Sequence, residues 1–291
     1  MEPVPFDKRS GKIWFNGHLV NWADVKIHVL NHGLHYASCV FEGERVYDKK
    51  IFKLEEHTER LFHSAARLGF EIPFTQKIIN ASCKEIVRIQ NVKNGYVRPV
   101  VWRGSEMMAI SAQKTKIHVA IATWDWGSYF DPNLKLKGIK LNISKWRRPA
   151  PNTIPWDTKA SGLYMICTLS KHEAEKDGFT DSLMLDHQDN IAEATGANIF
   201  FKNAKGELHT PTPDSFLDGI TRRSIIDIAK SKNIKIVERK IKPNELSEFT
   251  GCFLTGTAAE VTPVSKIDKY NFEVCDVIKD LSESYQTLVR K

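Results

Sequence analysis

The apolar positions of this chain follow the period of a helix in some regions and that of a strand in others. Helical spacing is clearest where Leu54, Leu61, Ala65 and Leu68 form one stripe. Gly69 follows this stripe, and glycine is typical of the position where a helix ends. The same spacing predicts further helices over 79–90, 163–178 and 274–288, and one that begins near residue 221.

Runs of apolar and β-branched residues predict the strands. Asn16-Gly17 between two apolar segments is a strong local signal of a hairpin, here over 12–20. Pro99 has no N–H to donate, so we expect the strand that contains it to be bulged or to lie at a sheet edge. Strands are expected at 96–102, 117–122, 181–186, 191–193, 199–201 and 251–256.

Two stretches rich in aromatic residues are harder to assign. The stretch 28–43 mixes aromatic and imidazole groups with small residues. It is consistent with a buried strand and turn, or with the wall of a small-molecule pocket. The stretch 124–133 breaks the strand pattern with Gly, Asp and Pro, and we interpret it as a linker that also covers a site.

Length and composition indicate a two-domain globular protein. The chain has 291 residues, of which 42% are hydrophobic and 26% charged. We expect a small N-terminal domain at 1–123, an interdomain loop at 124–134 and a larger C-terminal domain at 135–291. No run approaches the roughly 18 apolar residues that a membrane span needs, so we expect no membrane partner.

The charge and the cysteines exclude other classes of function. The net charge is +7, but the lysines are scattered and form no long basic block, so we expect no nucleic-acid partner. The five cysteines are an odd number, far apart and without metal-ligand spacing. We therefore expect reduced thiols, a cytoplasmic location and no metal site.

Lys159 is the first candidate for chemistry. It follows the proline-rich run 147–155 and precedes a helical pattern, so it lies at the mouth of a helix on a stiffened segment. Partial desolvation there would lower the pKa of the amine and make it a nucleophile or a base. A solvated loop lysine is the alternative, and from this stretch alone it is the more common case.

Other charged or small residues stand where a ligand could use them. Arg60 lies beside the apolar stripe of its helix, and Arg98 sits between apolar neighbours on a strand, where it must reach solvent or meet an anion. Glu193 ends an apolar strand and needs a hydrogen-bonded or cationic partner. The helix entry 219–221 and the turn 256–260 offer backbone amides to an anion.

Taken together, these motifs resemble the fold-type IV pyridoxal-phosphate transaminases, and among them the branched-chain amino acid aminotransferases. They occur in the order and at the spacing of that family from about residue 10 to 285. The matching segments are His35-Tyr36, Val40-Phe41-Glu42-Gly43, Glu59-Arg60-Leu61, Tyr96-Val97-Arg98-Pro99, Ala150-Pro151-Asn152, Lys159, Gly162-Leu163-Tyr164, Glu193 to Phe200, Leu217 to Thr221 and Gly256 to Glu260.

The resemblance implies an α+β fold, with a smaller N-terminal α/β domain and a larger C-terminal domain around a barrel-like β core. Lys159 would hold pyridoxal 5'-phosphate as a Schiff base and move the proton during transfer. Glu193 would pair with the protonated ring nitrogen, and Tyr164 would bond the ring hydroxyl. The phosphate and the other cofactor contacts would fall to Arg60, Thr195, Leu217, Ile220, Thr221 and Thr257.

The resemblance also implies a substrate pocket for Leu, Ile or Val in one half-reaction and glutamate in the other. Arg98 would serve the distal carboxylate of glutamate. The other substrate contacts would come from Tyr36, Phe41, Tyr96, Trp126, Tyr129, Tyr164 and the amides of Thr257, Ala258 and Ala259. Family members are homodimers or larger, including homohexamers, and Tyr36 would complete the site of the neighbouring subunit.

Three positions depart from the family pattern. Ala37 stands where glycine is usual, Glu44 where a smaller or polar residue is usual, and Phe130 where a small residue is common in the expected lid. They leave the substrate range open. A D-amino acid transaminase or an aminodeoxychorismate lyase of the same fold would share Lys159 and Glu193, and a binding protein without cofactor is the alternative from another class.

Overall fold

The computed structural model describes residues 4–127, 129–130 and 137–291. The chain divides into two compact units, Met1–Gly127 with Thr158–Gly162, and Ser128–Asp157 with Leu163–Lys291. Residues 128 and 131–134 of the expected interdomain loop lie outside the described residues, and the domain boundaries derived from the sequence stay a prediction.

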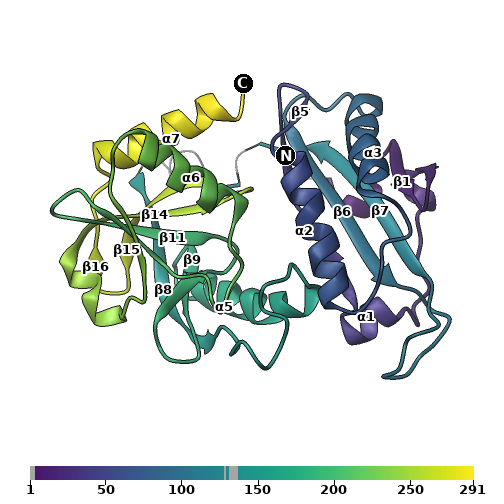
Figure 1. Cartoon of the computed structure of the whole chain (residues 1–291), viewed down its shortest axis with the longest axis horizontal. Helices are drawn as coiled ribbons and strands as arrows, with labels where there is room; N and C mark the ends of the chain where they lie inside the picture. Colours follow the sequence, from purple (N-terminus) through teal and green to yellow (C-terminus); the bar gives the residue numbers. More distant parts are fainter. Residues whose placement is uncertain (1–3, 128, 131–136) are drawn as a thin grey trace. The chain divides into compact units, whose positions relative to one another are not determined.

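The first unit is a seven-stranded sheet whose order is β2-β1-β7-β6-β4-β5, with β3 also paired to β6. Two helices, α2 and α3, pack on the sheet and against each other (Figure 1). The element bounds are η1 Phe6–Lys8, β1 Lys12–Phe15, β2 His18–Asn21, η2 Trp22–Asp24, α1 His32–Tyr36, β3 Cys39–Phe41, β4 Glu44–Tyr47, β5 Lys50–Ile51, α2 Leu54–Arg67, α3 Gln76–Ile89, β6 Gly95–Arg103 and β7 Ile117–Asp125.

The strongest local signals of the first unit are confirmed. Asn16 and Gly17 have φ of 49° and 95° and join β1 to β2, which is the backbone that a two-residue hairpin requires. Leu54, Leu61 and Ala65 are buried along α2. The apolar stripe predicted the correct face because burying it against the sheet removes that area from water.

The prediction that Pro99 marks an edge or bulged strand is wrong. β6 pairs with β7 along its whole length, and Pro99 lies opposite Ile121 in that ladder. The Pro99 carbonyl accepts a hydrogen bond from the Glu42 N–H on the other side, 2.9 Å away. In an antiparallel strand, the N and O of one residue point to the same side. The side of Pro99 that lacks an N–H therefore faces the gap between β3 and β4. For this reason β6 loses no hydrogen bond to β7.

The stretch 28–43 is only partly a strand. Its centre forms the short helix α1, which begins after Asn31, whose side chain accepts a hydrogen bond from the Leu34 N–H. Ala37 ends α1 in the left-handed conformation, with φ of 54°. A residue with a Cβ is strained there, which explains why the related pattern has glycine at this position. β3 then forms the strand that was predicted.

The second unit contains a nine-stranded mixed sheet. Its order is β10-β9-β8-β15-β14-β11-β12-β13, with β16 paired to β15. β10 also contacts β11 and β12, so the sheet curls back on itself and forms the barrel-like core that was expected. The strand bounds are β8 Ile139–Arg147, β9 Asp181–Leu185, β10 Ile191–Ala194, β11 Asn198–Asn203, β12 Leu208–Pro211, β13 Ile236–Arg239, β14 Phe249–Gly256, β15 Glu260–Ile267 and β16 Tyr270–Asn271.

Helices cover this curled sheet on more than one side. α5 packs on β8 and β9, whereas α6 and α7 pack against each other and on β14 and β15 (Figure 1). Phe130 is 7% exposed and belongs to the hydrophobic core of this unit, so its expected place in a lid is wrong. The remaining bounds are η3 Ser161–Tyr164, α5 Met165–Lys176, α6 Ile220–Ser231, η4 Pro243–Glu248 and α7 Asp276–Leu288.

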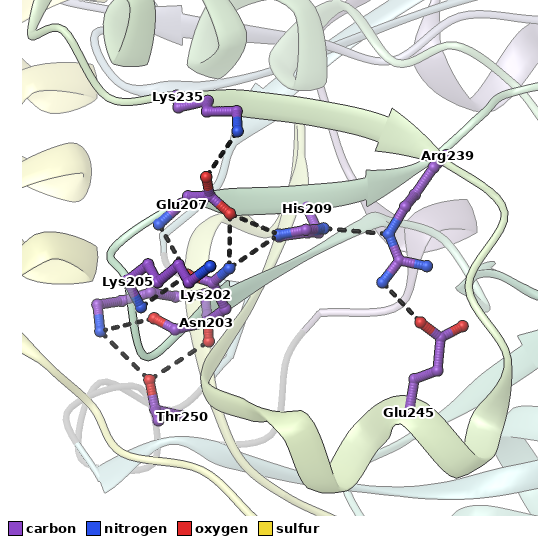
Figure 2. Close-up of polar contacts among 9 residues, drawn as sticks. All are labelled: Lys202, Asn203, Lys205, Glu207, His209, Lys235, Arg239, Glu245 and Thr250. Carbon is purple, nitrogen blue, oxygen red and sulfur yellow. Dashed lines mark hydrogen bonds and ion pairs between the residues drawn. The ribbon is translucent and has the colours of Figure 1, made fainter.

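A polar cluster ties β11, β12, β13 and η4 together. Figure 2 shows His209 at its centre, with Glu207 on one side and Arg239 on the other. Arg239 Nε donates to His209 Nδ1 at 3.2 Å, while Lys235 Nζ and Asn203 Nδ2 donate to Glu207 at 2.7 and 2.8 Å. These bonds to Lys235 and Asn203 lower the pKa of Glu207 to about 2. His209 Nδ1 accepts the bond from Arg239, so its lone pair is turned toward a cation.

Arg239→Met is expected to raise the pKa of His209. Burial lowers that pKa first and the Arg239 charge second, while Glu207 opposes both. Because the folded pKa is depressed, the unfolded chain takes up this proton first, and acidification through the unfolded pKa costs stability. An NMR titration of the His209 ring measures the shift, and Glu207→Gln should move it in the opposite direction. A lower or unchanged His209 pKa in Arg239→Met would contradict the role given to Arg239.

Candidate active site

Lys159 is held at its main chain by two elements of the first unit. Its N–H donates to Ser64 Oγ on α2 at 3.0 Å, and its carbonyl accepts from the Phe41 N–H at the end of β3 at 3.1 Å. The Lys159 Nζ atom lies 5.0 Å from the centre of the Phe41 ring. The interpretation as a solvated loop lysine is therefore wrong, because this amine stands over an aromatic face on a pinned backbone.

Arg60, also on α2, is bound to a buried carboxylate. Its Nε and Nη2 atoms donate to the two oxygens of Glu42 at 2.6 and 2.9 Å, and His57 Nδ1 lies 2.7 Å from the same carboxylate. Neither Glu42 nor His57 was assigned a role from the sequence. A carboxylate directly after the apolar pair Val40-Phe41 is the signal that could have indicated a buried partner.

Arg98 packs on aromatic rings. Its guanidinium carbon lies 4.7 Å from the centre of the Phe41 ring and 5.4 Å from that of Tyr96. The Arg98 Nε atom is buried and has no hydrogen-bond partner, and no carboxylate pairs with Arg98 in the described part of the chain. A buried donor of this kind is costly unless a ligand accepts from it, so Arg98 suits an incoming carboxylate.

The aromatic wall beside Arg98 depends on a glycine. A Cβ atom on Gly43 would collide with the Tyr96 hydroxyl. Tyr96 is 5% exposed and packs edge-on against Trp126, with ring centres 4.6 Å apart. Tyr36 is not part of this wall, since it is 43% exposed and packs on His32.

Glu193 in the second unit has the partners that its position required. Arg148 Nε forms an ion pair with Glu193 Oε1 at 3.3 Å, and Asn198 Nδ2 donates to Oε2 at 3.2 Å. The side chains of Arg148 and Glu193 are 5% and 11% exposed. A guanidinium next to a buried carboxylate favours the ionised acid. Arg148 and Asn198 were missed as site residues, although both lie inside motifs that the sequence pointed out.

Asn198 also connects Glu193 to the segment 217–219, which leads into α6. Its side chain also donates to the Leu217 carbonyl at 3.0 Å and accepts from the Gly219 N–H at 3.1 Å. Gly219 is the N-cap of α6 and gives no side-chain cap, so the amides of Ile220 and Thr221 open the helix uncapped. In the ladder Asn198 lies opposite Thr255, two residues before Thr257.

The remaining predicted residues lie as follows. Thr257, Ala258 and Ala259 form the tight turn from β14 to β15. Tyr164 ends η3 as the N-cap residue of α5. The Thr195 hydroxyl donates to Asp181 at 2.6 Å, and burial raises the pKa of that acid. Tyr129 is 45% exposed and packs on Phe130.

Two general properties complete this description. No group of three or more His, Cys, Asp and Glu side chains that could hold a metal ion occurs within residues 4–127, 129–130 and 137–291. Every helix within the same residues is too short or too polar to cross a lipid bilayer.

Comparisons with known proteins place the chain in a family. The family described as Amino-transferase class IV matches residues 39–267. The chain is 41% identical to the probable branched-chain-amino-acid aminotransferase of Rickettsia conorii, over 100% of both chains. The crystal structure of Escherichia coli branched-chain amino acid aminotransferase superposes with a TM-score of 0.92 at 34% identity, over 97% of this chain and 95% of that one.

A third comparison agrees with these. The branched-chain aminotransferase from Thermoproteus uzoniensis, solved with norvaline, superposes with a TM-score of 0.92 at 32% identity, over 97% of this chain and 95% of that one. The chain therefore belongs to the class IV aminotransferase family. The predicted resemblance, the fold type and the dependence on pyridoxal phosphate are confirmed.

The residues of this chain suit that cofactor. The uncapped start of α6 offers amides to a phosphate, and the unpaired Arg98 Nε offers a donor to a substrate carboxylate. Glu193 is a buried carboxylate in an ion pair with Arg148, which would suit a protonated ring nitrogen. Lys159 would offer its primary amine to the cofactor aldehyde. When it is bound there, pyridoxal phosphate supplies an electron sink for the bond cleaved at the substrate Cα.

Proposed function

We propose that this enzyme transfers the amino group between the branched-chain L-amino acids, Leu, Ile and Val, and 2-oxoglutarate. The observation that carries the proposal is Phe41, whose ring lies below the cation of Arg98 and below the amine of Lys159. One aromatic wall can then accept an apolar side chain, while its cationic edge accepts the distal carboxylate of glutamate. The branched-chain names of the relatives support this choice.

The chemical roles that we assign begin with the amine of Lys159. Lys159 would hold the cofactor through its amine, and the same amine would move the proton at the substrate Cα as general base and acid. Glu193 would stabilise the proton on the ring nitrogen, and its ion pair with Arg148 favours the ionised acid. Tyr164 would donate to the ring hydroxyl oxygen.

The phosphate and the substrate carboxylate are bound without a metal in this proposal. Arg60, the amides of Ile220 and Thr221 and the Thr257 hydroxyl neutralise the phosphate. Thr195 and Leu217 complete the cofactor contacts. The turn amides at Ala258 and Ala259 hold the substrate α-carboxylate. We assign the contacts with the substrate side chain to Phe41, Tyr96, Arg98, Trp126, Tyr129 and Tyr164.

A coupled assay decides between this function and the alternatives. The holoenzyme is offered L-leucine, D-alanine and aminodeoxychorismate, each with its acceptor. We expect turnover with L-leucine and 2-oxoglutarate. Turnover with D-alanine alone would indicate a D-amino acid transaminase, and lyase activity alone an aminodeoxychorismate lyase. In both cases the fold and Lys159 would keep their roles and the substrate assignment would fail.

Arg98→Ala is expected to raise the KM for glutamate about tenfold or more and that for leucine far less. The reason is that only glutamate offers a second carboxylate to the unpaired guanidinium. Steady-state kinetics in both directions measure the split, with Arg98→Lys as the variant that keeps the charge. Equal increases for the two substrates would remove Arg98 from this role.

We further propose that the enzyme is a homodimer or a larger homo-oligomer in the cytoplasm. Two neighbouring segments of the first unit expose large apolar side chains, and His32 joins them through Nε2 to the Ala109 carbonyl at 2.9 Å. A second copy of the chain would bury this patch and bring Tyr36 to its partner. The patch consists of Ile27, Val29, Leu30, Leu34, Tyr36, Met108 and Ile110. All five cysteines are free thiols, which agrees with the cytoplasm.

Ile110→Asp is expected to shift the oligomer toward the monomer and to lower activity. Ile110 is 84% exposed in the single chain, so a charge there is harmless unless a partner covers it. Light scattering coupled to size exclusion measures the mass. Ile78→Asp, at a 44% exposed apolar position on α3 outside the patch, is the matched control. A wild-type monomer at working concentration would contradict the proposal.

A further inference from the structure

Glu42 is one of the most deeply buried acids of the first unit. Its side chain has no exposed surface, and it lies at the break between β3 and β4. Its two oxygens accept from Arg60 at 2.6 and 2.9 Å, and one of them also accepts from His57 Nδ1 at 2.7 Å. A bidentate bond of this kind fixes the plane of the guanidinium as well as its position.

The burial and the mutual contacts of Glu42, Arg60 and His57 set the charge of each. Burial alone would raise the pKa of Glu42, but Arg60 and His57 together hold it well below its usual range. Burial is also the main reason that the pKa of His57 is lowered; Glu42 opposes this, and Arg60 and Lys159 add to it. At neutral pH the group is therefore a carboxylate, a guanidinium and a neutral imidazole that donates through Nδ1.

The same two elements that hold Arg60 also hold Lys159. Ser64 lies one turn after Arg60 on α2 and accepts from the Lys159 N–H. Phe41 directly precedes Glu42, and its N–H donates to the Lys159 carbonyl. The neighbouring residues Val40 and Ala160 form a β-bridge. The guanidinium of Arg60 and the main chain of Lys159 are thus both hydrogen-bonded to the same framework, which consists of α2 and the segment 40–42.

We propose that Glu42 is a positioning residue, which sets the guanidinium of Arg60 at the spacing from Lys159 that the phosphate and aldehyde of one cofactor molecule require. This inference rests on the proposed phosphate role of Arg60 and deepens it. The Nε edge of Arg60 faces Glu42, so the guanidinium is oriented before the ligand arrives. An anion site that is oriented in advance binds more tightly than one that must be ordered on binding.

A matched control lies two residues away. Glu44 has no exposed surface either, but its two oxygens have no hydrogen-bond partner in the described part of the chain. Burial, and next the charge of Glu42, raise the pKa of Glu44 well above its usual value. Glu44→Gln therefore changes a buried acid on the same segment without touching the bonds of Arg60.

The experiment compares the binding of pyridoxal phosphate with that of pyridoxal, which lacks the phosphate. Apoenzyme is titrated with each compound. The Kd for pyridoxal divided by the Kd for pyridoxal phosphate is the ratio that reports the phosphate contribution alone. Arg60→Ala should reduce this ratio strongly. Glu42→Gln should reduce it about tenfold or more, as loss of an outer-shell partner does, and should have no further effect when Arg60 is already Ala. Glu44→Gln should leave it unchanged.

The other outcomes distinguish a failure of the positioning role of Glu42 from a failure of the phosphate role of Arg60. If Arg60→Ala reduces the ratio while Glu42→Gln weakens both compounds equally, or strengthens phosphate binding, Glu42 is not a positioning residue and the proposed function stands. If Arg60→Ala leaves the ratio unchanged, the phosphate role of Arg60 fails, and the inference fails with it. Should Glu42→Gln not fold, Glu42→Asp replaces it, because its shorter carboxylate breaks the same bidentate pair.

Discussion

Lys159→Ala is expected to lower kcat by about 10⁴-fold or more and to remove the visible absorption of the covalently bound cofactor. The variant loses both the amine that binds the cofactor and the group that moves the proton at the substrate Cα, and acid–base catalysis alone contributes about 10²–10⁴-fold. The cofactor can still be held by its phosphate contacts, so binding should survive better than turnover. Absorption spectra near 410–430 nm, roughly where such a lysine adduct is expected to absorb, and steady-state assays measure the two effects.

The control for this prediction is Lys145→Ala. Lys145 is exposed and pairs with Glu173 at 2.9 Å, and we assign it no role in the reaction. It should keep wild-type spectrum and rate. If Lys159→Ala kept the visible band, another amine would carry the cofactor, and the assignment that the other roles depend on would be lost.

Glu193→Gln is expected to lower kcat by about 100-fold or more, the scale on which a positioned electrostatic partner acts. A neutral amide cannot stabilise the proton on the ring nitrogen, so the cofactor becomes a weaker electron sink. The same change leaves Arg148 beside a neutral group, at 3.3 Å in the present structure. Cofactor absorbance before and after addition of L-leucine separates a loss of chemistry from a loss of binding.

Glu245→Gln is a suitable control for Glu193→Gln. Glu245 also pairs with an arginine, Arg239, at 2.7 Å, but it lies at η4 and has no assigned role. Its substitution should leave kcat within about twofold of wild type, as surface ion pairs contribute little. Equal rates for Glu193→Gln and the wild type would show that the ring nitrogen does not depend on this carboxylate.

Local patterns predicted the helices and the hairpin of this protein because each is decided by its own residues. The α2 stripe and the Asn16-Gly17 turn are examples. Pro99 was misjudged for the opposite reason. Whether a missing N–H matters depends on which neighbour it faces, and that neighbour is Glu42, far away in the sequence. The parallel pair β12–β13 was not predicted, since neither of these two four-residue strands was among the strands expected from the sequence.

In the candidate site, too, some residues were assigned from the sequence and others were missed. Lys159, Arg60 and Glu193 were assigned through motifs, since their chemistry and spacing are recognisable in one dimension. Glu42 and Arg148 were not, because their role is to bond another side chain rather than a ligand. A buried polar residue in an apolar run signals that a partner exists, but it does not say which residue the partner is.

The segment Thr158–Gly162 groups with the first unit, although the chain on both sides of it groups with the second. During synthesis on the ribosome, the first unit consequently stays incomplete until Gly162 has left the exit tunnel, well after its last strand has been made. The reactive amine is thus delivered to its framework late, when much of the protein has already been made. Exchanging residues 1–127 alone between relatives would separate this framework from the lysine whose main chain it binds.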